Sequence, residues 1–195
     1  MRMFNWFVIG FLALALAERV YERRFSNRAV RGENKMEWSY TLLHTSYSVL
    51  FLGVALEHFL WERPVCLVAV GIGLVLYALG LMVRLSAIRA LGRFWSLHLE
   101  IRQDHQLVTE GIYRHMRHPA YSAIVLEVIS VPLVANAYWM LVFSVAWYVT
   151  LIVLRWHREE REMIVKFGEQ YVRYQESVPA FIPWRSLWPG KRHLS

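Results

Sequence analysis

The sequence predicts an all-α membrane protein: a polytopic helix bundle of about five transmembrane helices, with a cytoplasmic, interfacial helix near the C-terminus. Three observations predict this fold class. Of the 195 residues, 56% are hydrophobic and 19% are charged, whereas soluble domains carry about 25% charged residues. The hydrophobic residues gather in five runs. Lys and Arg alternate between the two sides of these runs. We therefore expect one integral membrane domain, residues 1–195.

The apolar runs define the expected spans in order. They cover residues 3–17, 39–61, 65–91, 120–135 and 138–154. At about 1.5 Å per residue, the second and third cross a hydrocarbon core of roughly 30 Å, and the others need flanking residues or a thinner bilayer. Residues 1–91 would form the first three helices. Residues 92–184 would form a linker, a helical hairpin that turns at Pro132 and Asn136, and a C-terminal helix.

The distribution of basic residues orients the chain. There is one Lys or Arg before the first run, six after it, one after the second, six from the end of the third (Arg84 onward) to the fourth, none after the fourth and eight after the fifth. Arg19 and Arg84 are counted here as loop residues. The positive-inside rule then places the N-terminus outside and the C-terminus in the cytoplasm. The net charge of +7 becomes a topology signal, so we expect membrane lipid and no nucleic acid as a partner.

The first run also has features of a signal peptide, because Arg2 precedes an apolar core that ends in Ala15-Leu16-Ala17. The strongly basic stretch after it orients the segment the other way, so we expect a retained first span. Cys66 is the only cysteine, which excludes an intrachain disulfide and a Cys-rich metal site, and we expect no metal.

Glycines in the third run indicate close helix packing rather than ligand contact, since small residues let helices approach each other. They are Gly71, Gly73 and Gly80. In the second run, Glu57 and His58 lie near the end and are interpreted as interfacial residues.

The linker 100–111, taken by itself, is interpreted as a solvated loop. Two further polar stretches lie on the expected cytoplasmic side. The first is GIYRHMRHPAY, residues 111–121. Pro119 suits the first turn of a helix, with His118 at its cap and Tyr121 one turn on. Free N–H groups there would attract a carboxylate or phosphate, but interfacial anchoring explains the stretch equally well. Arg114, His115 and Met116 are interpreted as interfacial.

The second polar stretch, residues 154–174, predicts one amphipathic helix on the cytoplasmic leaflet or against the bundle. Its apolar face would be Met163, Phe167, Tyr171 and Tyr174. Arg155 and Glu159 are four residues apart, and Glu160 and Glu162 add acidity close to the membrane. A surface ion pair is the simplest interpretation, but an arginine at the end of an apolar span is often functional.

Together these groups match S-adenosylmethionine, which carries a carboxylate, an ammonium, a ribose diol and a sulfonium. A nicotinamide nucleotide would use similar residue types, so residue types alone leave both ligands open.

Residues 93–184 resemble the isoprenylcysteine carboxyl methyltransferase family, which is related to membrane phospholipid N-methyltransferases. The resemblance rests on DHQLVTEGIYRHMRHPAYSA and RWHREEREMIVKFGEQYVRYQESVPAFIP. It implies a helical membrane bundle with a cytoplasmic S-adenosylmethionine pocket. The implied cofactor-binding residues are His105, Gln106, Leu107, Val108, Tyr113, His118, Pro119, Ala120, Tyr121 and Glu159. Arg155 would face the substrate, and Arg155 and Glu159 are the expected catalytic residues. His98 is a further candidate cofactor contact.

The expected function is therefore an S-adenosylmethionine-dependent methyltransferase that methylates a lipophilic or prenylated acceptor from the cytoplasmic face. The first expectation for the acceptor is the carboxylate of an isoprenylcysteine or a similar isoprenoid compound. The alternatives are a nicotinamide-nucleotide-dependent membrane reductase resembling sterol reductases, a phospholipid N-methyltransferase, and a non-enzymatic scaffold or small transporter. The last alternative predicts polar residues inside the spans.

Overall fold

The computed structural model describes residues 2–26, 33–34, 37–61, 63–92, 100–101 and 107–183. Nearly all of them are helical. The helices are α1 (Arg2–Ser26), α2 (Glu37–Leu60), α3 (Leu67–Leu91), the short 3-10 helix η2 (Gly111–Arg114), α4 (Pro119–Ala135), α5 (Tyr138–Phe167) and α6 (Glu169–Ser177). Strand β1 (Glu33–Asn34) pairs antiparallel with β2 (Glu100–Ile101).

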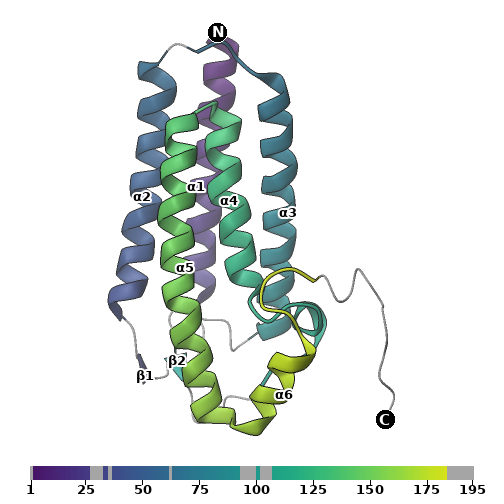
Figure 1. Cartoon of the computed structure of the whole chain (residues 1–195). Coiled ribbons are helices and arrows are strands. Elements are labelled where there is room, and N and C mark those ends of the chain that lie inside the picture. The colour runs from purple at the N-terminus through teal and green to yellow at the C-terminus, as the bar shows by residue number, and fades with distance from the viewer. Residues whose placement is uncertain are drawn as a thin grey trace.

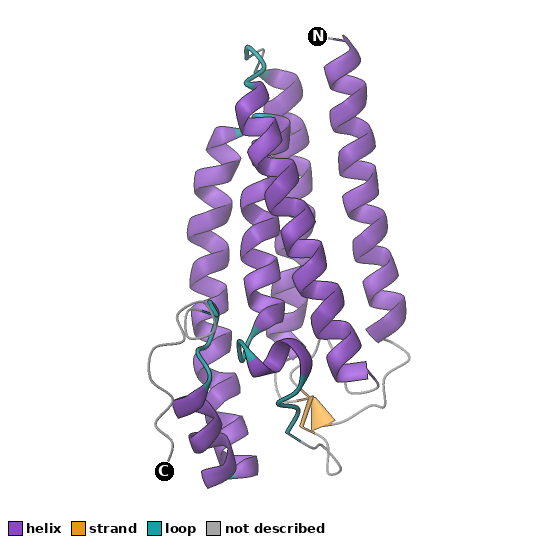
Figure 2. Ribbon diagram, turned by 90° about the vertical axis from the view of Figure 1, so that its right-hand side faces the viewer, coloured by secondary structure: helices purple, strands orange, loops and turns teal. Residues whose placement is uncertain are grey.

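The five long helices run side by side as one elongated bundle, and α6 turns back at its lower end (Figures 1 and 2). By length and composition, α1, α3 and α5 can each cross a membrane. Helix α4 is apolar but has 17 residues, and α2 has 24 residues. The all-α membrane bundle is thus confirmed. Among the described residues, three helices meet the requirements of a span, and crossings by α2 and α4 stay a prediction.

The hairpin between α4 and α5 is confirmed, and its turn is held by residues far away in the sequence. Asn136 adopts a left-handed conformation (φ 57°), and the N–H of Ala137 donates to the Pro132 carbonyl at 2.8 Å. The N–H groups of Trp139 and Met140 donate to the Glu57 carboxylate at 3.0 and 2.7 Å. A carboxylate at a helix N-terminus stabilises it.

Glu57 is only 4% exposed, so its interpretation as an interfacial residue was wrong. His58 also contacts the protein, since its Nδ1 lies 2.7 Å from the carbonyl oxygen of Ala135 and its Nε2 lies 3.2 Å from Oδ1 of Asn5. Both side chains join α2 to the end of the bundle that carries the α4–α5 turn.

Helices α3 and α4 pack closely because two glycines of α3 face α4. A Cβ at Gly73 would lie 2.8 Å from Val134 Cγ2, and one at Gly80 would lie 3.2 Å from Leu126 Cβ. The packing role is confirmed for these two glycines. Gly71 faces open space and takes no part in the contact.

A buried ionic network joins α1, α3 and α4. Arg84 donates to Glu22 at 2.9 Å and to Glu127, while Arg19 donates to Glu127 at 2.6 Å and pairs with Glu22 at 2.7 Å. Tyr47 of α2 also donates to Glu127, at 3.0 Å. The count of Arg19 and Arg84 as loop residues was wrong. Helix α1 extends beyond its apolar run to include Arg19, Arg84 lies inside α3, and both side chains turn inward.

The single amphipathic helix expected over residues 154–174 is in fact two helices. Gly168 has φ 55°, which a glycine adopts readily, and it ends α5 and starts α6. The expected apolar face still forms across this bend, since Met163 and Phe167 of α5 pack against Tyr171 and Tyr174 of α6.

Candidate active site

The stretch 111–121 forms η2 and the first turn of α4. Pro119 occupies the first position of α4, as expected, and is buried. Tyr113 is buried too, and its backbone carbonyl accepts a hydrogen bond from the Tyr174 hydroxyl at 2.5 Å. Met116 is 7% exposed, so its interpretation as interfacial was wrong. Arg114 and His115 are exposed. The stretch is therefore packed against α6 as well as lying at the rim of the bundle.

Tyr121 connects the two charged residues that the sequence predicted as catalytic. Its hydroxyl donates to Glu159 at 2.5 Å and accepts from Nε of Arg155 at 3.4 Å. Arg155 is 8% exposed, whereas the side chain of Glu159 is 28% exposed. The arrangement places a buried cation and a partly open carboxylate on either side of one phenol.

His118 completes this group from the cap of α4. Its ring stacks on Tyr121 with centroids 5.6 Å apart, and its Nδ1 lies 3.9 Å from Glu159. Its Nε2 lies 3.0 Å from Glu160, which also accepts from the Arg117 guanidinium at 2.7 Å and from Gln175 at 3.0 Å. Glu160 thereby ties α5 to the start of α4 and to α6.

The segment 178–183, which we name the C-terminal strap, takes up two N–H groups expected to be free for a ligand. Arg117 donates its N–H to Pro179 at 2.9 Å, and His118 donates its N–H to Ala180 at 2.8 Å. The expectation of free donors before the helix was therefore wrong for these two residues. Because Pro119 has no N–H, the donors left in the first turn of α4 are those of Ala120 and Tyr121.

The negative charge of Glu159 also acts on the phenol of Tyr113. Burial raises the pKa of its phenol above the usual value, and the charge of Glu159 raises it further. The phenol therefore stays protonated at neutral pH and can act as a hydrogen-bond donor. Val108 and Ala120 pack beside Tyr113, and Leu107 packs against Tyr174.

The structure thus brings Val108, Tyr113, Ala120 and the group around Tyr121 to one end of the bundle. The candidates His98, His105 and Gln106 lie outside the described residues.

Sequence reasoning missed two features near this site. Arg117 and Glu160 form a part-buried pair that anchors the turn Arg117-His118-Pro119, which we name the RHP turn. Both residues stand inside the quoted motifs, but the motifs did not indicate that they pair. The C-terminal strap acts through backbone carbonyls, so no residue type could have indicated it. Ser122 gives a further example, since its hydroxyl donates to the Phe181 carbonyl at 2.8 Å.

Chemically, the group offers a carboxylate for hydroxyl or ammonium donors, two backbone N–H donors for an anion, and a buried guanidinium for a second anion. Guanidinium groups favour carboxylates and phosphates because their planar fork matches two oxygens. Such a set suits two ligands side by side. One is zwitterionic and carries a diol, and the other is an anion.

Comparisons with known proteins identify the family of this chain. The model of the isoprenylcysteine carboxyl methyltransferase (ICMT) family matches residues 69–165. Protein-S-isoprenylcysteine O-methyltransferase B of Arabidopsis thaliana is 30% identical over 165 residues, covering 80% of this chain and 83% of the plant enzyme. The uncharacterized protein YpbQ of Bacillus subtilis is 27% identical, covering 72% of this chain and 85% of that protein.

A solved structure of similar fold is that of the eukaryotic intramembrane Ras methyltransferase ICMT. The TM-score is 0.61 at 23% identity, over 74% of this chain and 53% of the solved one. The matched family region includes α3, α4 and most of α5, which carry Tyr121, Arg155 and Glu159. The chain belongs to the isoprenylcysteine carboxyl methyltransferase family.

Proposed function

We propose that this membrane methyltransferase uses S-adenosylmethionine to methylate the carboxylate of an isoprenylcysteine or a similar isoprenoid acid. The observation that carries the proposal is the Tyr121 hydroxyl between the open Glu159 carboxylate and the buried Arg155 guanidinium. These two charges can hold two different ligands side by side, one on each side of Tyr121.

The residues around Glu159 fit the methyl donor. Glu159 would accept from the ribose hydroxyls or the ammonium, while the N–H groups of Ala120 and Tyr121 would donate to the donor's carboxylate. Tyr113 and Val108 would border the same ligand. S-adenosylmethionine, when bound, supplies an activated methyl group on a sulfonium.

Arg155 would hold the acceptor carboxylate. An ionised carboxylate attacks without losing a proton, so no general base is required, and the residues contribute alignment and exclusion of water. Arg155 suits this task because it is buried at the end of the apolar part of α5, where the head of a lipophilic acid would meet it. By the predicted orientation, the site would face the cytoplasm.

The test is methyl transfer from radiolabelled S-adenosylmethionine to S-farnesylcysteine by the full chain in detergent or nanodiscs. We expect a base-labile methyl ester, and we expect Glu159→Gln to lower the affinity for S-adenosylmethionine at least tenfold by calorimetry, since a charged hydrogen-bonding partner is lost. Glu169→Gln is the matched control, because that side chain is 89% exposed on α6. Unchanged affinity in Glu159→Gln would remove this residue from the donor site.

The same assay separates the acceptors. Label that appears only in phosphatidylethanolamine would indicate an N-methyltransferase and overturn the carboxylate proposal. Thermal stabilisation by a nicotinamide nucleotide alone would favour the reductase alternative, which the family comparisons do not support.

A further inference from the structure

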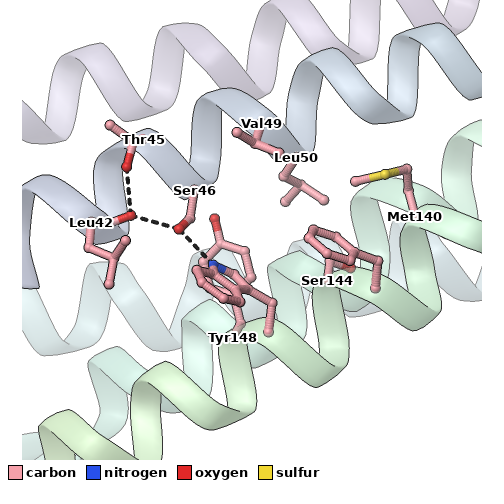
Figure 3. A pocket seen from close by; sticks show the side chains of 10 residues that line it. Leu42, Thr45, Ser46, Val49, Leu50, Met140, Ser144 and Tyr148 are labelled. Atoms are coloured by element: carbon pink, nitrogen blue, oxygen red, sulfur yellow. Dashed lines mark hydrogen bonds between the residues drawn. The ribbon is translucent and has the colours of Figure 1, made fainter.

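The groove between α2 and α5 is lined mainly by apolar side chains (Figure 3). The hydroxyls of Thr45 and Ser46, which line it, already donate to the Leu42 carbonyl at 3.0 and 2.6 Å. Ser46 also accepts a hydrogen bond from the Trp147 indole at 2.8 Å. A polar ligand finds better partners between α4 and α5, around His118.

Two neighbouring glutamates of α5 approach opposite ring nitrogens of His118. Glu160 Oε1 lies 3.0 Å from Nε2, and Glu159 Oε1 lies 3.9 Å from Nδ1. The ring is 5% exposed and stacks on Tyr121, which holds its plane. The two carboxylate side chains differ in exposure, since Glu160 is 13% exposed and Glu159 is 28% exposed. Glu160 therefore faces the protein, and Glu159 faces the more open side of the ring.

The partner of Glu160 makes this carboxylate a pure acceptor. The Arg117 guanidinium donates from Nε at 3.0 Å and from Nη2 at 2.7 Å to Oε1, the oxygen that also meets His118. An arginine side chain stays charged in proteins, and the ionised carboxylate beside it only accepts hydrogen bonds. The Nε2 of His118 must therefore carry a proton, because two acceptors form no hydrogen bond. In the neutral ring this leaves the lone pair on Nδ1.

The charges around the ring balance without a positive charge on the imidazole. Arg117 compensates Glu160, and Arg155 lies across the Tyr121 hydroxyl from Glu159. Two carboxylates thus face two guanidinium groups, which favours the neutral ring.

The Nδ1 atom of His118 forms no hydrogen bond with the described residues, and 3.9 Å to Glu159 is beyond hydrogen-bond distance. The lone pair of Nδ1 and the Glu159 carboxylate therefore stand as two acceptors, 3.9 Å apart. A ligand group with two N–H or O–H donors can bridge them, as an ammonium or a vicinal diol does.

From these contacts we propose that Glu160 is a positioning residue. It holds His118 with the proton on Nε2, so that Nδ1 and Glu159 together accept hydrogen bonds from the ammonium or the ribose hydroxyls of the methyl donor. This inference rests on the proposed function. A carboxylate that accepts from one ring nitrogen of a histidine fixes the tautomer and aims the other nitrogen, as in catalytic triads and metal sites. The two adjacent glutamates thus differ, since Glu159 touches the methyl donor and Glu160 acts through His118.

The tautomer can be observed directly in the ligand-free protein. The measurement is the side-chain nitrogen-15 spectrum of the full chain in nanodiscs at about pH 8, after labelling of its histidines. The signals of His118 are assigned by their loss in His118→Gln. We expect a protonated Nε2 and an unprotonated Nδ1, and we expect bound S-adenosylmethionine to shift the Nδ1 signal. A proton on Nδ1 of the parent, or an Nδ1 signal that the bound ligand leaves unmoved, would overturn the proposal.

Two amide substitutions separate the roles of the two ring nitrogens. His118→Asn puts an amide oxygen near the position of Nδ1 but gives up the contact with Glu160. His118→Gln can still donate to Glu160 but puts no acceptor at the position of Nδ1. By calorimetry, we expect His118→Asn to keep the affinity for S-adenosylmethionine within about threefold, and His118→Gln to lower it about tenfold, because an acceptor for a charged donor is lost. Equal affinities, or the reverse order, would contradict the proposal.

A double-mutant cycle distinguishes positioning from a purely structural role of Glu160. Glu160→Leu removes the acceptor, while Arg117 keeps the carbonyls of Gln175, at 2.9 Å, and of Val178 as partners. We expect Glu160→Leu to lower the affinity for S-adenosylmethionine about fivefold in the parent and to have no effect in His118→Asn, whose amide has no tautomer to fix. Glu160→Gln keeps an acceptor oxygen and should stay within about twofold of the parent. An equal loss in both backgrounds would leave Glu160 only a structural role.

Glu169→Leu is the control, since it removes an exposed carboxylate of α6, and melting temperatures check the folding of each variant. If Glu160→Leu does not fold, the spectrum of the parent and the two His118 variants still decide. A parent that does not bind S-adenosylmethionine would refute the proposed function. A parent that binds it without coupling between Glu160 and His118 would refute only the positioning role.

Discussion

Tyr121 illustrates how single residues organise the site. Arg155 and Glu159 lie one turn apart on α5, which their spacing predicts, and Tyr121 of α4 supplies the hydroxyl that contacts both. The sequence could indicate that the three residues share a site. It could not indicate that Arg155 is buried while Glu159 is partly open, and this difference is what assigns them to different ligands.

At this scale we predict the effect of Arg155→Lys. An ammonium keeps the charge but loses the planar fork, so the KM for S-farnesylcysteine should rise about 10- to 100-fold. The affinity for S-adenosylmethionine should not change. Steady-state kinetics and calorimetry measure the two quantities, with Arg173→Lys on the exposed face of α6 as control. A parallel loss of both affinities would place Arg155 with the methyl donor instead.

Among the elements, the contact between α3 and α4 sets the position of the RHP turn at the start of α4. Gly73 of α3 allows this contact, and Gly71 of the same helix, which does not face α4, can be compared with it. Gly73 meets both the side chain and the backbone of Val134, whereas a Cβ at Gly71 would meet nothing within 4 Å.

We therefore predict opposite results for two identical substitutions. Gly73→Ala should destabilise the protein by about 1–3 kcal/mol, because α4 must move to admit the methyl group. At about 2–4 °C per kcal/mol for a chain of this size, the melting temperature in detergent should fall by several degrees. Gly71→Ala should leave it unchanged or raise it slightly, since alanine favours helix. A similar fall in both variants would mean that helix contact is not the cause.

For the molecule as a whole, the ionic network explains how α1 is attached to the family core. The family match begins at residue 69. Helix α1 reaches α3 through the pair of Glu22 with Arg84, and α4 through the pair of Arg19 with Glu127. Removing one partner of a buried ion pair leaves a charge uncompensated, so each member depends on the others. Polar residues do therefore occur inside the bundle, and here they join helices to one another.

The orientation of the whole molecule can be tested with its natural thiol. Cys66 is exposed between α2 and α3, at the end of the bundle that we predict to be outside. A membrane-impermeant maleimide should label it on intact cells. In a Cys66→Ser background, Glu169→Cys on α6 should be labelled only after permeabilisation. The reverse pattern would invert the topology and place the site outside.

The sequence by itself determined the helical membrane fold, the α4–α5 hairpin and the family. These follow from local signals: apolar runs, Pro119 at a helix start, Asn136 at a turn, and motifs that keep Arg155 and Glu159 one turn apart. Sequence reasoning did not single out Glu127, although it is the single acid within the apolar run 120–135 and such residues are often functional.

Only the tertiary structure decided which polar groups pair. Arg19 meets Glu127 across 108 residues, and Arg84 meets it across 43. The N–H groups of the RHP turn are taken by strap carbonyls, which every residue carries alike. Such contacts depend on how helices pack and have no periodic or compositional signature. The network and the strap therefore became visible only when the helices were assembled.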